Sequence, residues 1–136
     1  MKKYEPIVKT FYDSLEEGKI LGRKCTACGH VEFPPYLACN TCGNLDTEWV
    51  EMSGKAVATQ VIIQPMVFAD AGFEARHGKN YCLCSVKPEE SDELNAVLMG
   101  VGPDRVEELQ AKLPVPVKPV IVQEDGYKIV CWELAE

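Results

Sequence analysis

The first regular hydrophobic pattern in the chain predicts an amphipathic helix over residues 6–17. Ile7, Phe11 and Leu15 recur at the spacing that places side chains on one helical face, and a glycine follows the pattern. A helix of about three turns is marginal by itself and has to pack on something. Its apolar stripe therefore either covers the domain behind it or docks a partner protein. If it docks a partner, the candidate contact residues are Ile7, Phe11 and Tyr12.

After residue 53 the pattern changes to runs of β-branched and other apolar residues, which predict five strands. The residue pair Gly102-Pro103 opens a short predicted helix between the third and fourth strands. A hairpin turn at 124–127 is expected between the last two strands. Two prolines in the fourth strand indicate an edge or a bulge. This order is typical of an OB-type barrel in a mainly β protein. The predicted strands are 55–64, 81–86, 95–100, 115–122 and 128–133.

The connection between the first two of these strands is unusually long, at residues 65–80. Long connections in compact domains are usually functional or disordered, and the loop after the first strand of an OB barrel is a common ligand site. Two aromatic residues and three possible cations favour a clamp for an anionic, partly apolar ligand or for a partner surface. The alternative is a loop that folds its aromatic residues back onto the barrel. The candidate contact residues are Phe68, Phe73, Arg76, His77 and Lys79.

Two matched Cys-x-x-Cys-Gly turns precede the barrel and predict a metal site. Cys25 and Cys28 form the first turn, and Cys39 and Cys42 form the second, with ten residues between the pairs. Two thiolates at this spacing bind one ion without backbone strain, and two such pairs complete a tetrahedral site with four sulfurs, as in structural zinc centres. Iron in a rubredoxin-like site is the chemical alternative, because it uses the same ligands and geometry.

Strand-like residues flank the first cysteine turn, so residues 19–52 are interpreted as a zinc ribbon. So short a segment has little core, and its folding is expected to depend on the metal. His30 leaves the first turn and is predicted to be a surface residue, since four cysteines already satisfy zinc. We therefore divide the chain into a helix at 1–18, a zinc ribbon at 19–52 and an OB-fold domain at 53–136.

Composition narrows the function classes. The chain has 136 residues, 46% of them hydrophobic, without an apolar run long enough to span a membrane. Seven cysteines, an odd number, without a secretion signal lead us to expect a reducing, cytoplasmic location. The formal net charge of −7, from 14 basic and 21 acidic side chains, disfavours general binding to nucleic acid backbones. We expect neither nucleic acid nor membrane as a partner.

No group of residues in the sequence assembles an obvious active site. Cys82 and Cys84 lie two apart in a predicted strand, so they share a face and are interpreted as core residues, as is Cys131. Paired acidic residues such as Glu89-Glu90 are typical of solvated turns and helix faces. No phosphate-binding glycine loop is present. We therefore expect a protein that binds rather than one that catalyses a reaction by itself.

The cysteine turns and the residues around them resemble one known family. It comprises acyl-CoA-associated proteins with a rubredoxin-like zinc ribbon followed by an OB domain, long catalogued as a domain of unknown function. The similarity extends over nearly the whole chain, and it is most specific in the ribbon and in the joint that follows. The residues that carry it are 22–29, 32–35, 39–42, 46 and 48–54.

This resemblance implies a role in a complex. Members of the family typically accompany thiolase-like enzymes as non-catalytic subunits, which implies a thiolase-type catalytic partner, a hetero-oligomer such as a heterotetramer, and CoA or acyl-CoA as a ligand of the complex. The chain departs from the family pattern at Tyr36, where arginine is frequent, and at Asn40, where proline is frequent. Two rival functions remain open: a nucleic-acid-binding ribbon and OB module, and an electron carrier with iron bound by four sulfurs.

Overall fold

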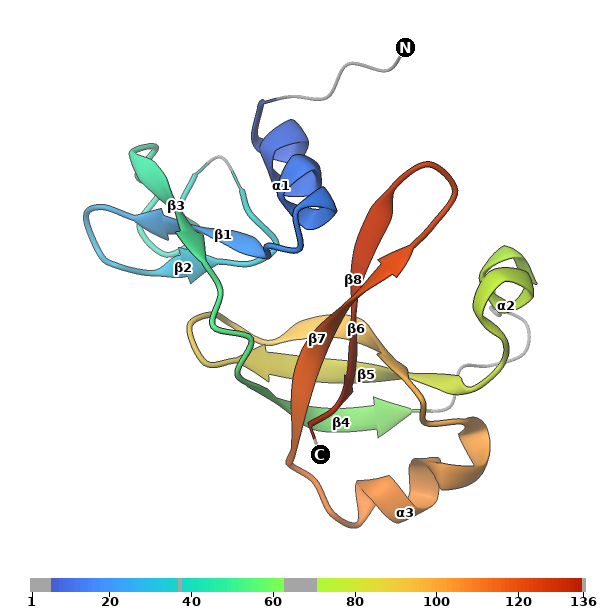
Figure 1. Ribbon diagram of the computed structural model, residues 1–136. Helices are drawn as coiled ribbons and strands as arrows, with labels where there is room; N and C mark the ends of the chain where they lie inside the picture. The colour runs from blue at the N-terminus through green and yellow to red at the C-terminus, as the bar shows by residue number, and fades with distance from the viewer. Residues whose placement is uncertain (1–5, 37, 63–70, 136) are drawn as a thin grey trace.

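The computed structural model describes residues 6–36, 38–62 and 71–135. An N-terminal helix and a small three-stranded sheet lie beside a five-stranded barrel (Figure 1). The helix α1 covers Pro6–Glu16, and Gly18 follows it with a φ of 79°. The predicted helix is thus confirmed, and glycine ends it because the left-handed conformation carries no steric cost there.

The zinc ribbon contains three strands where the sequence predicted a two-stranded hairpin. Strands β1 (Leu21–Cys25), β2 (Val31–Glu32) and β3 (Thr47–Glu51) form an antiparallel sheet in the order β2-β1-β3. Residues 47–51 belong to the predicted ribbon, but the sequence pattern predicts no strand there. Strand β3 pairs along the whole of β1, and Arg23 faces Trp49 in this register with its guanidinium carbon 4.7 Å from the ring centroid. This cation–π contact stabilises the pairing.

The five strands that follow close the barrel predicted from the sequence, in the order β4-β5-β6-β8-β7. Neighbouring strands are antiparallel except β6 and β8, which are parallel. A 3-10 turn, η2 (Pro103–Arg105), and helix α3 (Val106–Gln110) lie between β6 and β7 as expected. This order confirms the OB-type barrel. The strands are β4 (Ala56–Ile62), β5 (Tyr81–Pro88), β6 (Leu94–Met99), β7 (Val115–Gln123) and β8 (Lys128–Leu134).

Strand β7 shows why Pro119, one of its two prolines, is tolerated. It pairs with β8 over residues 117–123 but with β4 only over residues 115–117. Pro119 lies beyond this short pairing, where a missing N–H group leaves no partner on β4 unsatisfied. At the other end of this pairing, the Gln110 side chain of α3 donates a hydrogen bond of 2.9 Å to the Val61 carbonyl of β4. The strand is thus an edge over part of its length only.

The core fills the barrel and extends into the ribbon. Val61, Cys82, Val86 and Leu98 are fully buried inside the barrel, as the two-residue alternation of β4, β5 and β6 requires. Phe33, from the residues just after β2, belongs to the same hydrophobic cluster. The ribbon and the barrel therefore share one core, and their division into separate domains at residue 53 stays a prediction.

The turn between β5 and β6 joins the ribbon to the barrel through three successive residues. Glu90 accepts a hydrogen bond from the Ser53 N–H group, at 2.6 Å from its Oε2. Ser91 donates a buried hydrogen bond of 2.9 Å to the Val31 carbonyl. The Asp92 carboxylate lies 3.1 Å from His30 Nε2. We call residues 90–92 the clasp, because they contact the joint after the ribbon, strand β2 and His30 in turn.

The connection between β4 and β5 contains a second helix that the sequence interpretation missed. Helix α2 covers Ala71–His77, and the rest of the connection lies partly outside the described residues. Among the helices of the described ranges, none has the length and apolar character needed to cross a membrane.

Candidate metal centre and apolar surfaces

The four predicted cysteines meet at one point of the ribbon. Cys25 ends β1 and Cys28 follows in the next turn, while Cys39 and Cys42 come from the turn after β2. Their sulfurs all lie within 4.8 Å of one another. The distances between the Sγ atoms of Cys25 and Cys42, and between those of Cys28 and Cys39, are 3.6 Å. A tetrahedron with metal–sulfur bonds of about 2.3 Å has edges of about 3.8 Å, so the cluster fits zinc.

Backbone geometry shapes the two cysteine turns in the same way. Gly29 and Gly43 have φ values of 80° and 79°, and each donates its N–H group to the carbonyl of the first cysteine of its turn. Only glycine adopts this conformation without strain. Cys25 and Cys39 are buried, whereas Cys28 and Cys42 are exposed. An ion in this site would thus have two buried sulfur ligands on the ribbon side and two solvent-exposed sulfur ligands on the other side.

Local dipoles adjust the acidity of the sulfurs. The N–H group of Cys28 lowers the pKa of the Cys25 thiol to about 6, and the N–H group of Cys42 likewise lowers the pKa of Cys39. The N–H group of His30 also favours a lower pKa at Cys28. Desolvation and the neighbouring sulfurs outweigh this effect and raise the pKa of Cys28 to about 12. Binding an ion thus requires the release of protons, which makes metal affinity depend on pH.

Polar residues next to the cluster fix the turns in place. The Asn44 side chain lies with its Nδ2 atom 3.7 Å from Cys25 Sγ. Glu32 is buried and accepts hydrogen bonds from the backbone N–H and the side-chain amide of Asn40, at 2.7 and 3.2 Å. His30 is not part of the sulfur cluster. Its side chain is 19% exposed, which is less than expected for a surface residue, because the ring lies between Glu32 and Asp92.

The predicted docking helix α1 divides its residues between core and surface. Phe11 packs against the core, with its ring centroid 6.1 Å from that of Phe33. Tyr12 meets Tyr127 edge to face at 6.2 Å. The side chain of Ile7 is outside the described residues. An apolar hollow of about 180 Å³ lies between the helix and the ribbon, and we call it the α1 groove. Its lining residues are Val8, Phe11, Tyr12, Pro34 and Pro35.

In the predicted clamp of the long connection, two of the three possible cations already contact a carboxylate of the barrel. Arg76 and His77 both contact the buried carboxylate of Glu124, at 2.5 Å from Nη2 and 2.7 Å from Nε2. Lys79 is exposed. Phe68 and the side chain of Phe73 are outside the described residues. Contact of these residues with a ligand stays a prediction, but much of the charge of Arg76 is already compensated by Glu124.

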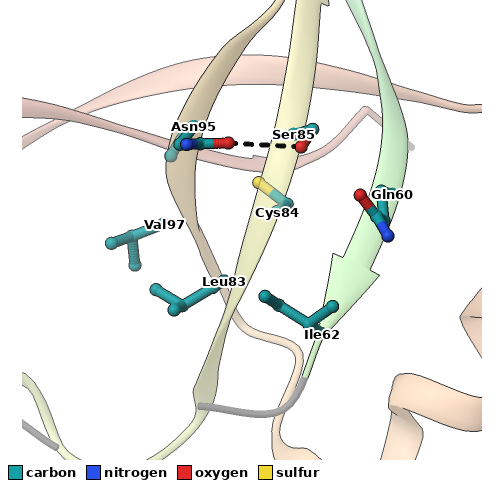
Figure 2. Close-up of a pocket in the computed structure, with 8 residues that line it drawn as sticks. Gln60, Ile62, Leu83, Cys84, Ser85, Asn95 and Val97 are labelled. Atoms are coloured by element: carbon teal, nitrogen blue, oxygen red, sulfur yellow. Dashed lines mark hydrogen bonds between the residues drawn. The ribbon is translucent and has the colours of Figure 1, made fainter. Parts of the chain in front are cut away.

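A hollow on the outer face of the barrel was not foreseen from the sequence. It measures about 380 Å³ and lies over β4, β5 and β6 (Figure 2). The alternation within each strand could have indicated the outward positions among its lining residues, but not that three strands align them; Cys84 and Ala96 belong to the core side of their strands. The residues that line it are Gln60, Ile62, Leu83, Cys84, Ser85, Asn95, Ala96 and Val97.

Comparison with known proteins relates both parts of the chain to one family. Residues 13–48, which include all four cysteines, match the model of the ChsH2 rubredoxin-like zinc ribbon domain. A DUF35 domain-containing scaffold protein of Pyrococcus furiosus is 34% identical over 112 residues, which are 82% of this chain and 78% of that protein.

Two solved structures have the same fold. The Ltp2-ChsH2(DUF35) aldolase superposes with a TM-score of 0.71 at 20% identity, with 98% of each chain covered. A DUF35-family protein of unknown function from Sulfolobus solfataricus gives a TM-score of 0.57 at 16% identity, covering 96% of this chain and 86% of that one.

Proposed function

This chain belongs to the DUF35 domain family, and we propose that it is a zinc-stabilised, non-catalytic accessory subunit of an acyl-CoA thiolase-type complex. The observation that carries the proposal is its similarity to a protein described as a scaffold, which extends over 82% of the chain. A second DUF35 chain belongs to an aldolase whose name joins it to Ltp2. Both descriptions favour assembly with another protein.

The chemistry of the described residues supports a non-catalytic role. A thiolase-type reaction needs a reactive thiolate with a histidine base beside it. Cys82, Cys84 and Cys131 are at most 4% exposed, and burial raises the pKa of Cys82 to about 11. His77 contacts the buried carboxylate of Glu124. In this proposal the partner supplies the nucleophile and the bases.

The metal centre serves assembly in this proposal. Zinc, when bound by the four cysteines, supplies a crosslink between the two turns of the ribbon. The ribbon then holds the Pro34-Pro35 segment opposite helix α1. The α1 groove between them is apolar and faces solvent, with Val8 37% exposed. We infer that Tyr12 and this groove contact the catalytic subunit.

The acyl-CoA site belongs to the complex rather than to this chain alone. We propose that the connection after β4 contributes to it through Lys79 and the aromatic residues Phe68 and Phe73. Arg76 and His77 hold α2 in place through Glu124, and this positions the connection near its ligand or partner. No cation and no aromatic ring occurs among the eight residues lining the hollow on the barrel face, so nucleic acid binding is not favoured there.

Copurification tests the proposal. A tagged chain is purified from its native host, and the bound proteins are identified by mass spectrometry. We expect a thiolase-type subunit in a fixed ratio. Thiolysis of a 3-oxoacyl-CoA is then measured with each chain alone and with both together.

We expect activity only when both chains are present. A catalytic subunit that is soluble and fully active by itself would contradict the proposal, and so would thioester turnover by the present chain without a partner. The absorption spectrum of the same sample distinguishes the metals, because zinc thiolates have no visible band whereas iron bound by four sulfurs is red.

A further inference from the structure

The hollow on the barrel face is built from two parallel rows of side chains that cross three strands. In the pairing register Ile62 faces Leu83, and Leu83 faces Val97, which gives an apolar row. Gln60 faces Ser85, and Ser85 faces Asn95, which gives a polar row two residues further along. Figure 2 shows both rows on the same side of the sheet. We call this surface the β4–β6 face.

Both rows are accessible from outside. Ile62 is 44% exposed, although it is a large aliphatic residue. In the polar row the Ser85 hydroxyl donates a long hydrogen bond of 3.4 Å to Asn95 Oδ1. A bond of this length is weak, so these groups can exchange it for a better partner at low cost. The surface therefore offers hydrocarbon at one end and uncharged hydrogen-bonding groups at the other.

The absence of charge on this face is informative in so acidic a chain. None of the eight lining residues carries a charge, whereas the chain has 35 charged residues, 14 basic and 21 acidic. Centres of protein–protein interfaces are depleted in charge because an unpaired buried charge is expensive, and their anchors are apolar side chains in a hollow. A nucleic acid or a phosphate group would require cations here, and the lining provides none.

We propose that the β4–β6 face docks an uncharged segment of the catalytic subunit, an inference that rests on the function proposed above. An aliphatic or aromatic side chain of that segment covers the row of Ile62, Leu83 and Val97. Its amide or hydroxyl groups bond to the row of Gln60, Ser85 and Asn95. The occupant is electrically neutral because the face itself carries no charge to balance. This contact is separate from the α1 groove and adds a second point of attachment.

The test uses the copurified complex and three variants of this chain. Val97→Lys places a charge in the apolar row, and Val97→Thr removes apolar character with little change in volume. Leu45→Lys is the matched control, since Leu45 is 70% exposed and does not line this hollow. Dissociation constants are measured by biolayer interferometry with the purified catalytic subunit. Circular dichroism and the urea midpoint establish that each variant is folded.

We expect binding at least about tenfold weaker for Val97→Lys, a smaller loss of about threefold for Val97→Thr, and a change below about twofold for Leu45→Lys. Folded Val97 variants that bind like the wild type would overturn the inference while leaving the proposed function intact. A change in the self-association of this chain, seen by light scattering, would assign the face to a second copy and also overturn it. If no catalytic subunit copurifies with the wild type, the proposed function fails first and this inference fails with it.

Discussion

The seven cysteines of this chain have two different chemical roles, and their positions separate them. Four lie in turns whose N–H groups point at sulfur and whose glycines bring the two pairs together. Three lie on barrel strands, where they are buried among apolar neighbours. The sequence predicted both groups, because the Cys-x-x-Cys-Gly spacing and the two-residue alternation are local patterns. The surroundings of His30 were not predictable, because Asp92 lies far from it in the sequence.

Loss of one cluster cysteine should remove the metal. In Cys42→Ser, a hydroxyl replaces a thiolate and leaves a three-sulfur site that binds zinc much more weakly. We expect zinc content well below one ion per chain by elemental analysis, together with a lower urea midpoint. Cys82→Ala is the control: it should lower stability through a small cavity but keep the full zinc content. Equal zinc content in both variants would argue against a four-cysteine site.

The three buried thiols should make stability fall at alkaline pH. A thiol ionises near pH 9.0 when unperturbed, whereas burial raises the pKa of Cys82 and Cys131 to about 11 and that of Cys84 to about 12. Because the folded-state pKa is raised, this stabilisation is complete below pH 9.0 and is lost as pH rises through about 11.

The free energy of unfolding in urea, measured at pH values below and above 9.0, checks this expectation. Cys82→Ala should show a shallower decline than the wild type, since one of the three thiols is gone, while the tyrosine and lysine contributions are common to both proteins. Parallel declines would show that Cys82 ionises equally easily in the folded and unfolded chains.

At the scale of elements, Glu124 connects two segments that are distant in sequence. It lies in the turn between β7 and β8, its side chain is 3% exposed, and it accepts contacts from Arg76 and His77 at the end of α2. Hydrogen bonds to charged groups contribute about 1.5–3 kcal/mol each when buried. Helix α2 has only seven residues and a glycine at its second position, so its own helical preference is small.

Replacing this carboxylate should release α2. In Glu124→Gln the charge is lost but the shape is kept, so we expect about 2 kcal/mol less stability for the α2 attachment. Hydrogen exchange of the amides at 74–78 should then become faster while exchange in β5 and β6 stays slow. Glu107→Gln, on the exposed side of α3, is the matched control. Unchanged protection of α2 in Glu124→Gln would mean that other contacts hold the helix.

This helix illustrates where sequence interpretation ends. The barrel strands were predictable because β-branched runs and the hairpin turn at 124–127 are visible within ten residues. Helix α2 and strand β3 were missed because each is short and depends on a distant partner, Glu124 in one case and β1 in the other. The β4–β6 face was missed for a related reason: it exists only when three strands pair in register.

At the scale of the whole molecule, the clasp attaches the ribbon to the barrel. Glu90 and Ser91 form hydrogen bonds to the joint and to strand β2, and the Asp92 carboxylate lies 3.1 Å from His30 after the first cysteine turn. Phe33 adds a ribbon side chain to the barrel core. A change in the metal centre is therefore expected to alter the stability of the barrel. The chain provides a reporter in each part, since its two tryptophans are Trp49 in β3 and Trp132 in β8.

Metal removal should be detected by the tryptophan of the barrel. In Trp49→Phe the fluorescence reports on Trp132 alone, and we expect a chelator to lower the urea midpoint of this signal. Adding Ser91→Ala, which removes the buried bond to Val31, should reduce the size of that shift because the two parts are less tightly joined. Ser85→Ala, a hydroxyl on the outer face, is the control. If the chelator leaves the urea midpoint of the Trp132 fluorescence unchanged, the two parts unfold independently.

Strand β8 lies between β7 and β6 in the barrel and pairs with both, so the barrel cannot close without it. It also meets the first helix: Lys128, its first residue, lies 3.2 Å from Glu16, and the preceding Tyr127 meets Tyr12 edge to face. During synthesis on the ribosome, the cysteine turns can therefore bind their ion early. Helix α1, which is synthesised before them, can pack against the barrel only after β8 has been synthesised. A nascent chain stalled before residue 128 would expose both α1 and the barrel interior to chaperones.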